Sequence, residues 1–137
     1  MIPTIANHHV PKFSSALSRA SAFYLCAIGG ATLFASRELM DAVVPGVPLA
    51  LEWLGQMLAG AWLAAAQFNW SGRSTLMGGI YGRPQLSLNL VLFLVSALGL
   101  WKTGPTGAAF WILTVPMTAF AGVYAALLVR GPFDRLA

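Results

Sequence analysis

The sequence predicts an all-helical membrane protein, a bundle of four transmembrane helices with its N-terminus and C-terminus in the cytoplasm. Two observations carry this prediction. Hydrophobic residues make up 58% of the 137-residue chain and charged residues only 9%, which leaves too few polar groups to cover a water-facing surface. The apolar residues gather in four long stretches, and a helix needs about 20 mainly apolar residues to cross a bilayer core. We therefore expect a single membrane domain over residues 1–137.

The four apolar stretches set the expected bounds of the helices. We expect spans at residues 16–36, 47–70, 85–101 and 107–129. Residues 1–15 are expected to form an N-terminal cytoplasmic arm, and residues 71–84 a cytoplasmic loop. A cleaved secretory signal is disfavoured, because the first stretch is long enough to span and charged residues follow where a cleavage site would need small ones. Pro116 is expected to bend the fourth span, since proline removes a backbone donor and clashes with the preceding turn.

Basic residues set the expected orientation, because Lys and Arg accumulate on the cytoplasmic side of membrane proteins. Most of the 8 lie near the two termini and in the central loop: Lys12, Arg19, Arg73, Arg83, Arg130 and Arg135. Only Arg37 and Lys102 fall in the two other connections. The net charge of +4 is therefore a topology signal. No nucleic acid is expected as a partner, because the basic residues are spread singly rather than gathered in a patch.

Small residues at four-residue spacing predict the helix-packing faces, because association in lipid depends on close approach of the backbones. The expected packing residues are Ser18, Ala22, Cys26 and Gly30 on the first span, Gly60 and Ala64 on the second, and Gly122 and Ala126 on the fourth. If these faces converge, the sequence predicts a polar interior. Its expected members are Glu52, Gln56, Gln67, Asn89, Ser96, Thr114 and Thr118.

Two interpretations of this interior stay open. Amides and hydroxyls serve as hydrogen bonds between membrane helices, whereas an acid inside a span is costly and tends to serve ion pairing or proton transfer. The second interpretation depends on Glu52, which follows Pro48 closely enough to lie instead at headgroup level, near Arg37 and Lys102. Trp62 lies in the middle of the second span, where its indole N–H is expected to bond to a neighbouring helix.

The central loop combines several glycines with Arg73 and Arg83. The glycine spacing fits neither the phosphate loop nor the dinucleotide fingerprint. We expect the two arginines to hold the loop against anionic lipid headgroups, at about 1 kcal/mol each, with docking of a partner as the alternative. A short interfacial or re-entrant helix over residues 76–81 stays open.

Several kinds of chemistry are excluded by counting. Cys26 is the only cysteine, so no disulfide can form within one chain. His8 and His9 are adjacent and cannot clasp a metal or a haem without further ligands, and no histidine lies in the spans to serve a serine triad. We expect no enzyme, no metal and no cofactor. Contact with a pigment or a quinone stays open, because apolar grooves suit both.

These observations predict a small accessory or scaffold subunit of a bacterial cytoplasmic (inner) membrane. Its expected partners are membrane lipids and other membrane-protein subunits, or copies of itself in a homo-oligomer. The alternative is a small transporter, or a membrane protein that binds a lipid or another hydrophobic ligand. In that alternative Glu52 is the coupling acid, and Gln56, Asn89 and Thr118 are substrate contacts.

Overall fold

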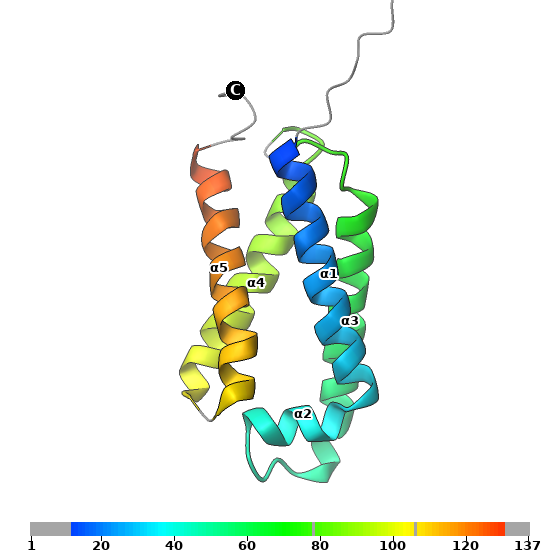
Figure 1. Cartoon of the computed structure of the whole chain (residues 1–137), viewed down its shortest axis with the longest axis vertical. Helices are drawn as coiled ribbons and strands as arrows, with labels where there is room; N and C mark the ends of the chain where they lie inside the picture. Colours follow the sequence, from blue (N-terminus) through cyan, green and yellow to red (C-terminus); the bar gives the residue numbers. More distant parts are fainter. Residues whose placement is uncertain (1–11, 78, 106, 131–137) are drawn as a thin grey trace, which may run out of the picture.

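The computed structural model describes residues 12–77, 79–105 and 107–130. Its helices are α1 Lys12–Phe34, α2 Ser36–Val43, the short 3-10 helix η1 Leu49–Leu51, α3 Glu52–Ser71, α4 Arg83–Thr103 and α5 Ala108–Arg130 (Figure 1). Four segments are long and apolar enough to cross a membrane, namely α1, η1 with α3, α4 and α5. The described residues contain no strand. The prediction of an all-helical chain with four membrane-length helices is confirmed.

With η1 counted as the start of the second span, the bounds of the four membrane-length segments lie within four residues of those expected from the sequence. The largest difference is at the start of α1, which begins at Lys12, so residues 12–15 belong to the first helix rather than to an arm. The remainder of the expected arm, residues 1–11 with His8 and His9, lies outside the described residues, as does Arg135.

The short helix α2 is a feature that the sequence analysis missed, because it expected a simple connection there. The chain leaves α1 at Ala35, where φ is −129° and ψ is 44°, and α2 then runs across the end of the bundle (Figure 1). Its apolar residues Leu39, Met40 and Val43 are half-buried, whereas Arg37 is exposed. This spacing makes one apolar face on a helix, but α2 has only 8 residues, too few for a periodic signal.

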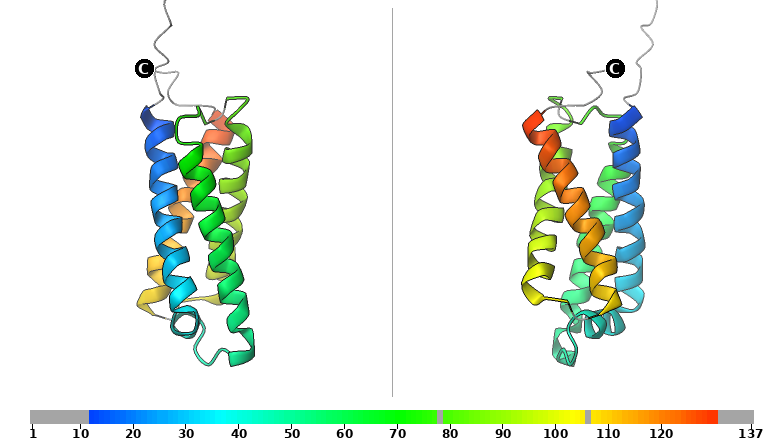
Figure 2. Two further views of the ribbon diagram at one scale, coloured as in Figure 1. Left: turned by 90° about the vertical axis from the view of Figure 1, so that its right-hand side faces the viewer. Right: turned by 60° about the vertical axis from the view of Figure 1, so that its left-hand side comes forward.

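The four long helices pack as two pairs, α1 with α3 and α4 with α5, and the most extensive contacts between helices lie within these pairs. Figure 2 shows all four running along the length of the bundle. The N-terminal end of α1, the C-terminal end of α5 and the α3–α4 connection share one end, which we call the loop end (Figure 1). The opposite end, where α2 and the α4–α5 connection lie, is the α2 end. Among the described residues, Arg73, Arg83 and Arg130 lie at the loop end.

An aromatic cluster joins α1, α4 and α5 in the core. The ring of Phe93 stacks on Phe120 with 4.8 Å between centroids and on Tyr124 with 5.8 Å. Tyr24 reaches the same cluster, 5.7 Å from Phe120, and its hydroxyl donates to the backbone carbonyl of Leu113 at 3.1 Å. Such pairs contribute about 0.5–1.5 kcal/mol beyond the area that they bury, so they help to hold the two helix pairs together.

Residues 72–77 and 79–82, the described part of the connection from α3 to α4, form turns and bends, and no helix forms over the described residues of 76–81. The segment folds back onto the bundle, because Met77 is fully buried and its backbone N–H donates to Ser14 Oγ at 3.3 Å. Gly82 is required by close approach, since a Cβ at this position would overlap the backbone carbonyl of Leu76. The central segment is therefore a packed element of the fold.

Pro116 lies inside α5, which continues to Arg130. The hydroxyl of Thr118 donates to the backbone carbonyl of Thr114 at 2.8 Å. The carbonyl whose usual donor the proline removes is that of Ile112, so this bond does not replace the missing one. The bend expected at Pro116 stays a prediction.

Candidate functional site

Buried polar side chains gather at the loop end of the bundle. We call Ser18 of α1, Asn69 of α3, and Gln85 and Asn89 of α4 the polar cluster. None of the four is more than 3% exposed. The sequence places them in three different helices, each within about two turns of the loop end, so the cluster exists only once the chain has folded.

The polar cluster is satisfied by its own hydrogen bonds. The amides of Asn69 and Asn89 bond reciprocally, with N–O distances of 2.7 and 2.6 Å. Gln85 Nε2 donates to Ser18 Oγ at 2.6 Å and to Asn69 Oδ1 at 3.0 Å, and Ser18 Oγ donates to the backbone carbonyl of Asn69 at 2.7 Å. These hydrogen bonds link α1, α3 and α4.

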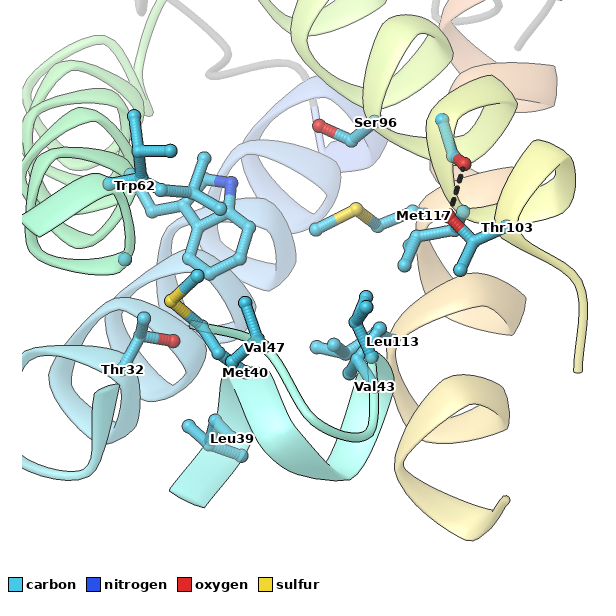
Figure 3. Close-up of a pocket in the computed structure, with 16 residues that line it drawn as sticks. Thr32, Leu39, Met40, Val43, Val47, Trp62, Ser96, Thr103, Leu113 and Met117 are labelled. Carbon is cyan, nitrogen blue, oxygen red and sulfur yellow. Dashed lines mark hydrogen bonds between the residues drawn. The ribbon is translucent and has the colours of Figure 1, made fainter. Parts of the chain in front are cut away.

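A cavity of about 390 Å³ lies at the α2 end, between the two helix pairs (Figure 3). Its lining is neutral and mostly apolar: Thr32, Leu39, Met40, Val43, Val44, Val47, Leu54, Gly55, Leu58, Trp62, Ser96, Gly99, Leu100, Thr103, Leu113 and Met117. The helix α2 supplies one wall, so the element that the sequence did not reveal also builds the cavity. Ligand pockets have volumes of about 300–1,000 Å³ and mainly apolar walls, and this cavity has both properties.

Two buried polar atoms have no hydrogen-bond partner among the described residues, Trp62 Nε1 and Thr114 Oγ1. Trp62 lines the cavity and is only 5% exposed. Its indole N–H was expected to bond to a neighbouring helix, and no such bond forms within the described chain. A buried donor without a partner costs about 1–3 kcal/mol, and this nitrogen is itself covered by the surrounding protein atoms.

The structure corrects the expected polar interior. Asn89 and Thr114 are buried, and Glu52 and Ser96 are half-buried, but Gln56, Gln67 and Thr118 are exposed on the outside of the bundle. The inward face of α3 instead carries Gly55, Ala59, Trp62, Ala65, Ala66 and Asn69. Small residues occur on both sides of this helix, so composition could not show which side faces inward.

The expected packing stripes are also displaced. Ser18 and Ala22 are buried, Gly30 and Ala126 are half-buried, and Cys26, Gly60, Ala64 and Gly122 are exposed. The reason is geometric: at 3.6 residues per turn, a step of four residues overshoots one turn by about 40°, so a long stripe of four-residue steps winds around the helix. The observed inward face of α5 combines steps of three and four residues: Phe110, Thr114, Met117, Ala121, Tyr124 and Leu127.

Glu52 lies far from Asn89, a residue of the expected solute site. It is the first residue of α3, and its backbone carbonyl accepts a hydrogen bond from Ser36 Oγ at 3.2 Å. Asn89 bonds to Asn69 at the opposite end of α3, about 25 Å from Glu52 along the helix at about 1.5 Å per residue. Gln56 and Thr118 are exposed on the outside of the bundle, so the expected solute site does not form as one interior cluster in this structure.

The two loop arginines differ in their surroundings. The guanidinium of Arg73 lies over the ring of Trp70, 4.7 Å from its centroid, and its Nη1 donates to the Trp70 carbonyl at 2.7 Å. Arg83 is exposed at the start of α4. Among the described residues no group of His, Cys, Asp and Glu could hold a metal ion.

Comparison with known proteins finds no family model, no curated protein and no solved structure that matches this chain.

Two members of the polar cluster, Asn69 and Gln85, were not expected from the sequence. Both lie near helix ends, where polar residues are common. The four-residue spacing of Gln85 and Asn89 was the available signal, since it places two amides on one helix face.

Proposed function

We propose that this chain is a small accessory subunit that catalyses no reaction and that assembles with a larger membrane complex, or with copies of itself, through the outer face of α3. We place it in a bacterial cytoplasmic membrane with the loop end in the cytoplasm, following the excess of basic residues at that end. The observation that carries the proposal is the composition of this outer face: Gln56, Gly60, Ala64 and Gln67.

These four residues follow one another at steps of four, four and three, so they lie on one side of the helix. All four are exposed, and no hydrogen bond joins the side chain of Gln56 or Gln67 to another described residue. Lipid chains cannot hydrogen-bond to an amide, whereas a neighbouring transmembrane helix can. The outer face of α3 therefore offers two amides, one near each end, to a partner.

The small residues between the amides support the same proposal. A Cβ added at Gly60 would meet no atom within 4 Å apart from its own helix backbone, so a helix from another chain can approach closely there. Close approach at small residues is the main source of helix association in lipid. The solute-transport alternative has less support, because the residues that it needs lie apart in the bundle.

The test is extraction of the native protein in a gentle detergent or in nanodiscs, followed by mass spectrometry of the proteins that co-migrate with it. We expect stoichiometric recovery with other subunits or as a homo-oligomer, and loss of this association in Gly60→Leu. The matched control is Gly99→Leu, a glycine of α4 whose Cβ position is equally open. A wild-type protein that migrates as a monomer would contradict the proposal, as would a Gly60→Leu protein that assembles normally.

A further inference from the structure

We propose that a groove between α1 and α3 at the loop end binds one anionic phospholipid of the bilayer, with Arg19 and Arg73 on its phosphate and an acyl chain in the groove. The inference goes beyond the proposed assembly. The groove borders the outer face of α3 at Gln67, but neither arginine belongs to that face.

The groove is an apolar hollow of about 300 Å³ on the outside of the bundle, between two helices that pack along their length. Ala22 and Ala66 are buried and small, so they leave space outside them, whereas Cys26 on the same lining is exposed. The hollow extends about 10 Å along α3 from Leu63 to Trp70, at about 1.5 Å per residue. Its lining contains no charged residue: Ala22, Phe23, Cys26, Leu63, Ala66, Gln67 and Trp70. These properties suit an acyl chain that lies along the two helices.

Two arginines flank the loop end of the groove, one on each helix. The rings of Phe23 and Trp70 meet edge to face, with 5.6 Å between their centroids. Arg19 precedes Phe23 by four residues and therefore lies on the same side of α1. The guanidinium of Arg73 lies 4.7 Å from the centroid of the Trp70 ring. Both cations are therefore close to the aromatic pair that ends the groove.

The polar cluster sets the level of Arg19 in the bundle. Ser18 Oγ donates to the backbone carbonyl of Asn69 at 2.7 Å. Arg19 and Trp70 follow these two residues in the sequence, so they lie at about the same level. Side chains on a helix lean toward its N-terminus, which for α1 is the loop end (Figure 1). The Arg19 guanidinium therefore extends toward the headgroups, on the same side of the membrane as Arg73.

The charge at this end identifies the ligand as an anion. Arg19 is exposed and Arg73 is half-buried, and neither forms an ion pair with another described residue. Arg73 uses one N–H on the Trp70 carbonyl, and a guanidinium has five N–H donors. The acids of the described chain all lie toward the α2 end: Glu38, Asp41 and Glu52. Two arginines without an acid provide the donors that a phosphate accepts.

The order of these groups along the bundle distinguishes a phospholipid from a free anion. The cations lie at the end of the groove nearest the headgroups, and the apolar hollow extends from them toward the middle of the membrane. A phospholipid has the same order, with its phosphate at headgroup level and its chains in the hydrocarbon layer. A free phosphate would contact the arginines and leave the hollow without a ligand.

The test is native mass spectrometry of the full-length protein, purified and stripped of lipid in detergent, then titrated with dioleoyl phosphatidylglycerol or dioleoyl phosphatidylcholine. The two lipids have the same chains, and only the first has a net charge. We expect the wild type to bind one phosphatidylglycerol with a Kd about 30-fold below that for phosphatidylcholine, the equivalent of two basic contacts. Arg19→Gln/Arg73→Gln should remove this preference.

Arg83→Gln/Arg130→Gln is the matched control for charge. It removes the same number of charges at the loop end, but from α4 and α5, neither of which lines the groove. This control should therefore keep the preference for phosphatidylglycerol.

Cys26→Trp tests the hollow itself. It fills the groove from an exposed position of its lining and should raise the Kd for phosphatidylglycerol by about fivefold or more. Ala119→Trp adds the same side chain at an exposed position on α5 outside the groove and should bind like the wild type. Thermal unfolding of each variant shows that it is folded.

Four results would overturn the inference. The wild type binds the two lipids equally, or the charge control loses the preference as fully as Arg19→Gln/Arg73→Gln. Glycerol phosphate, which has no chains, competes with the lipid and so reveals a site for a free anion. Cys26→Trp loses associated subunits but binds phosphatidylglycerol normally, so that the groove holds a partner helix. Gly60→Leu should lose the proposed assembly and keep the lipid, so failure of either proposal is observed separately.

Discussion

In the polar cluster, the side chains of Asn69 and Asn89 each donate a hydrogen bond to the other and accept one from it. This pair of bonds should stabilise the fold. A hydrogen bond between membrane helices contributes only about 0.6 kcal/mol on average, but leaving one buried amide without its partner costs about 1–3 kcal/mol. The second cost is larger because the amide that remains is buried and cannot form a hydrogen bond to water instead. At the scale of single residues, removing one of the two amides should therefore cost more than the hydrogen bond between them contributes, and the costs of removing the two should not add.

A mutant cycle on this pair tests that statement. Asn89→Leu should lower the free energy of unfolding by about 1–3 kcal/mol, because it leaves the Asn69 amide buried and only partly bonded. The double variant Asn69→Leu/Asn89→Leu should cost less than the sum of the two single variants, since both polar groups are then removed. The measurement is reversible denaturation in mixed micelles, followed by circular dichroism.

Gln56→Leu is the control for this cycle, because Gln56 is exposed and should change the unfolding free energy of the isolated protein by less than about 0.5 kcal/mol. Strict additivity of the two asparagine substitutions would contradict the idea that the amides stabilise each other.

The connection between α3 and α4 packs against the core of the bundle. Met77 inserts into the core, and two glycines permit the close approaches that this requires. A Cβ at Gly72 would lie 2.6 Å from Gln85 Oε1, and a Cβ at Gly82 would overlap the Leu76 carbonyl. The first obstacle is a side chain that can shift, whereas the second is backbone. The two glycines therefore differ in the cost of substitution.

Gly82→Ala should accordingly destabilise the protein by about 1–3 kcal/mol, the usual cost of an overpacked position. Gly99→Ala is the matched control, because its Cβ meets no atom within 4 Å apart from its own helix backbone, and alanine favours a helix by about 1 kcal/mol over glycine. Thermal unfolding in detergent should therefore show a lower midpoint for Gly82→Ala and an unchanged or higher midpoint for Gly99→Ala. Equal midpoints would mean that the connection is free to rearrange.

Across the whole molecule, the two ends of the bundle differ in charge. Among the described residues, Lys12, Arg19, Arg73, Arg83 and Arg130 lie toward the loop end, while the acids Glu38, Asp41 and Glu52 lie toward the α2 end. Because basic residues are retained in the cytoplasm during insertion, this difference should fix one orientation of all four helices together.

Cysteine labelling measures that orientation. In a Cys26→Ser background, Lys102→Cys should react with a membrane-impermeant maleimide added to intact cells, because this residue is exposed at the α2 end. Arg73→Cys at the loop end should react only after the membrane is permeabilised. Labelling of both residues from the same side would contradict the four-span topology, and the reversed pattern would contradict the orientation.

The bounds of the long helices could be predicted from the sequence to within a few residues. The helix α2 and the buried faces of the long helices could not. A membrane span is recognised from about 20 mainly apolar residues of one segment, and this signal does not depend on how the other helices pack against it. In contrast, Leu39, Met40 and Val43 are too few to reveal an amphipathic helix until a bundle lies beside them. Gly60 and Gly55 have similar composition around them, so only the contact of Gly55 with Ser36 and Met40 of α2 shows that it faces inward.

The sequence by itself determined that the chain forms four membrane-length helices, where they begin and end to within a turn or so, and that Trp62 lies at mid-span with a donor that needs a partner. These properties follow from the composition and length of single segments. Only the tertiary structure decided that Asn69, Gln85 and Asn89 satisfy one another, that the small-residue face of Gly60 points outward, and that α2 completes a cavity beside Trp62. Those properties depend on the rotation and depth of one helix against another, which no single segment contains.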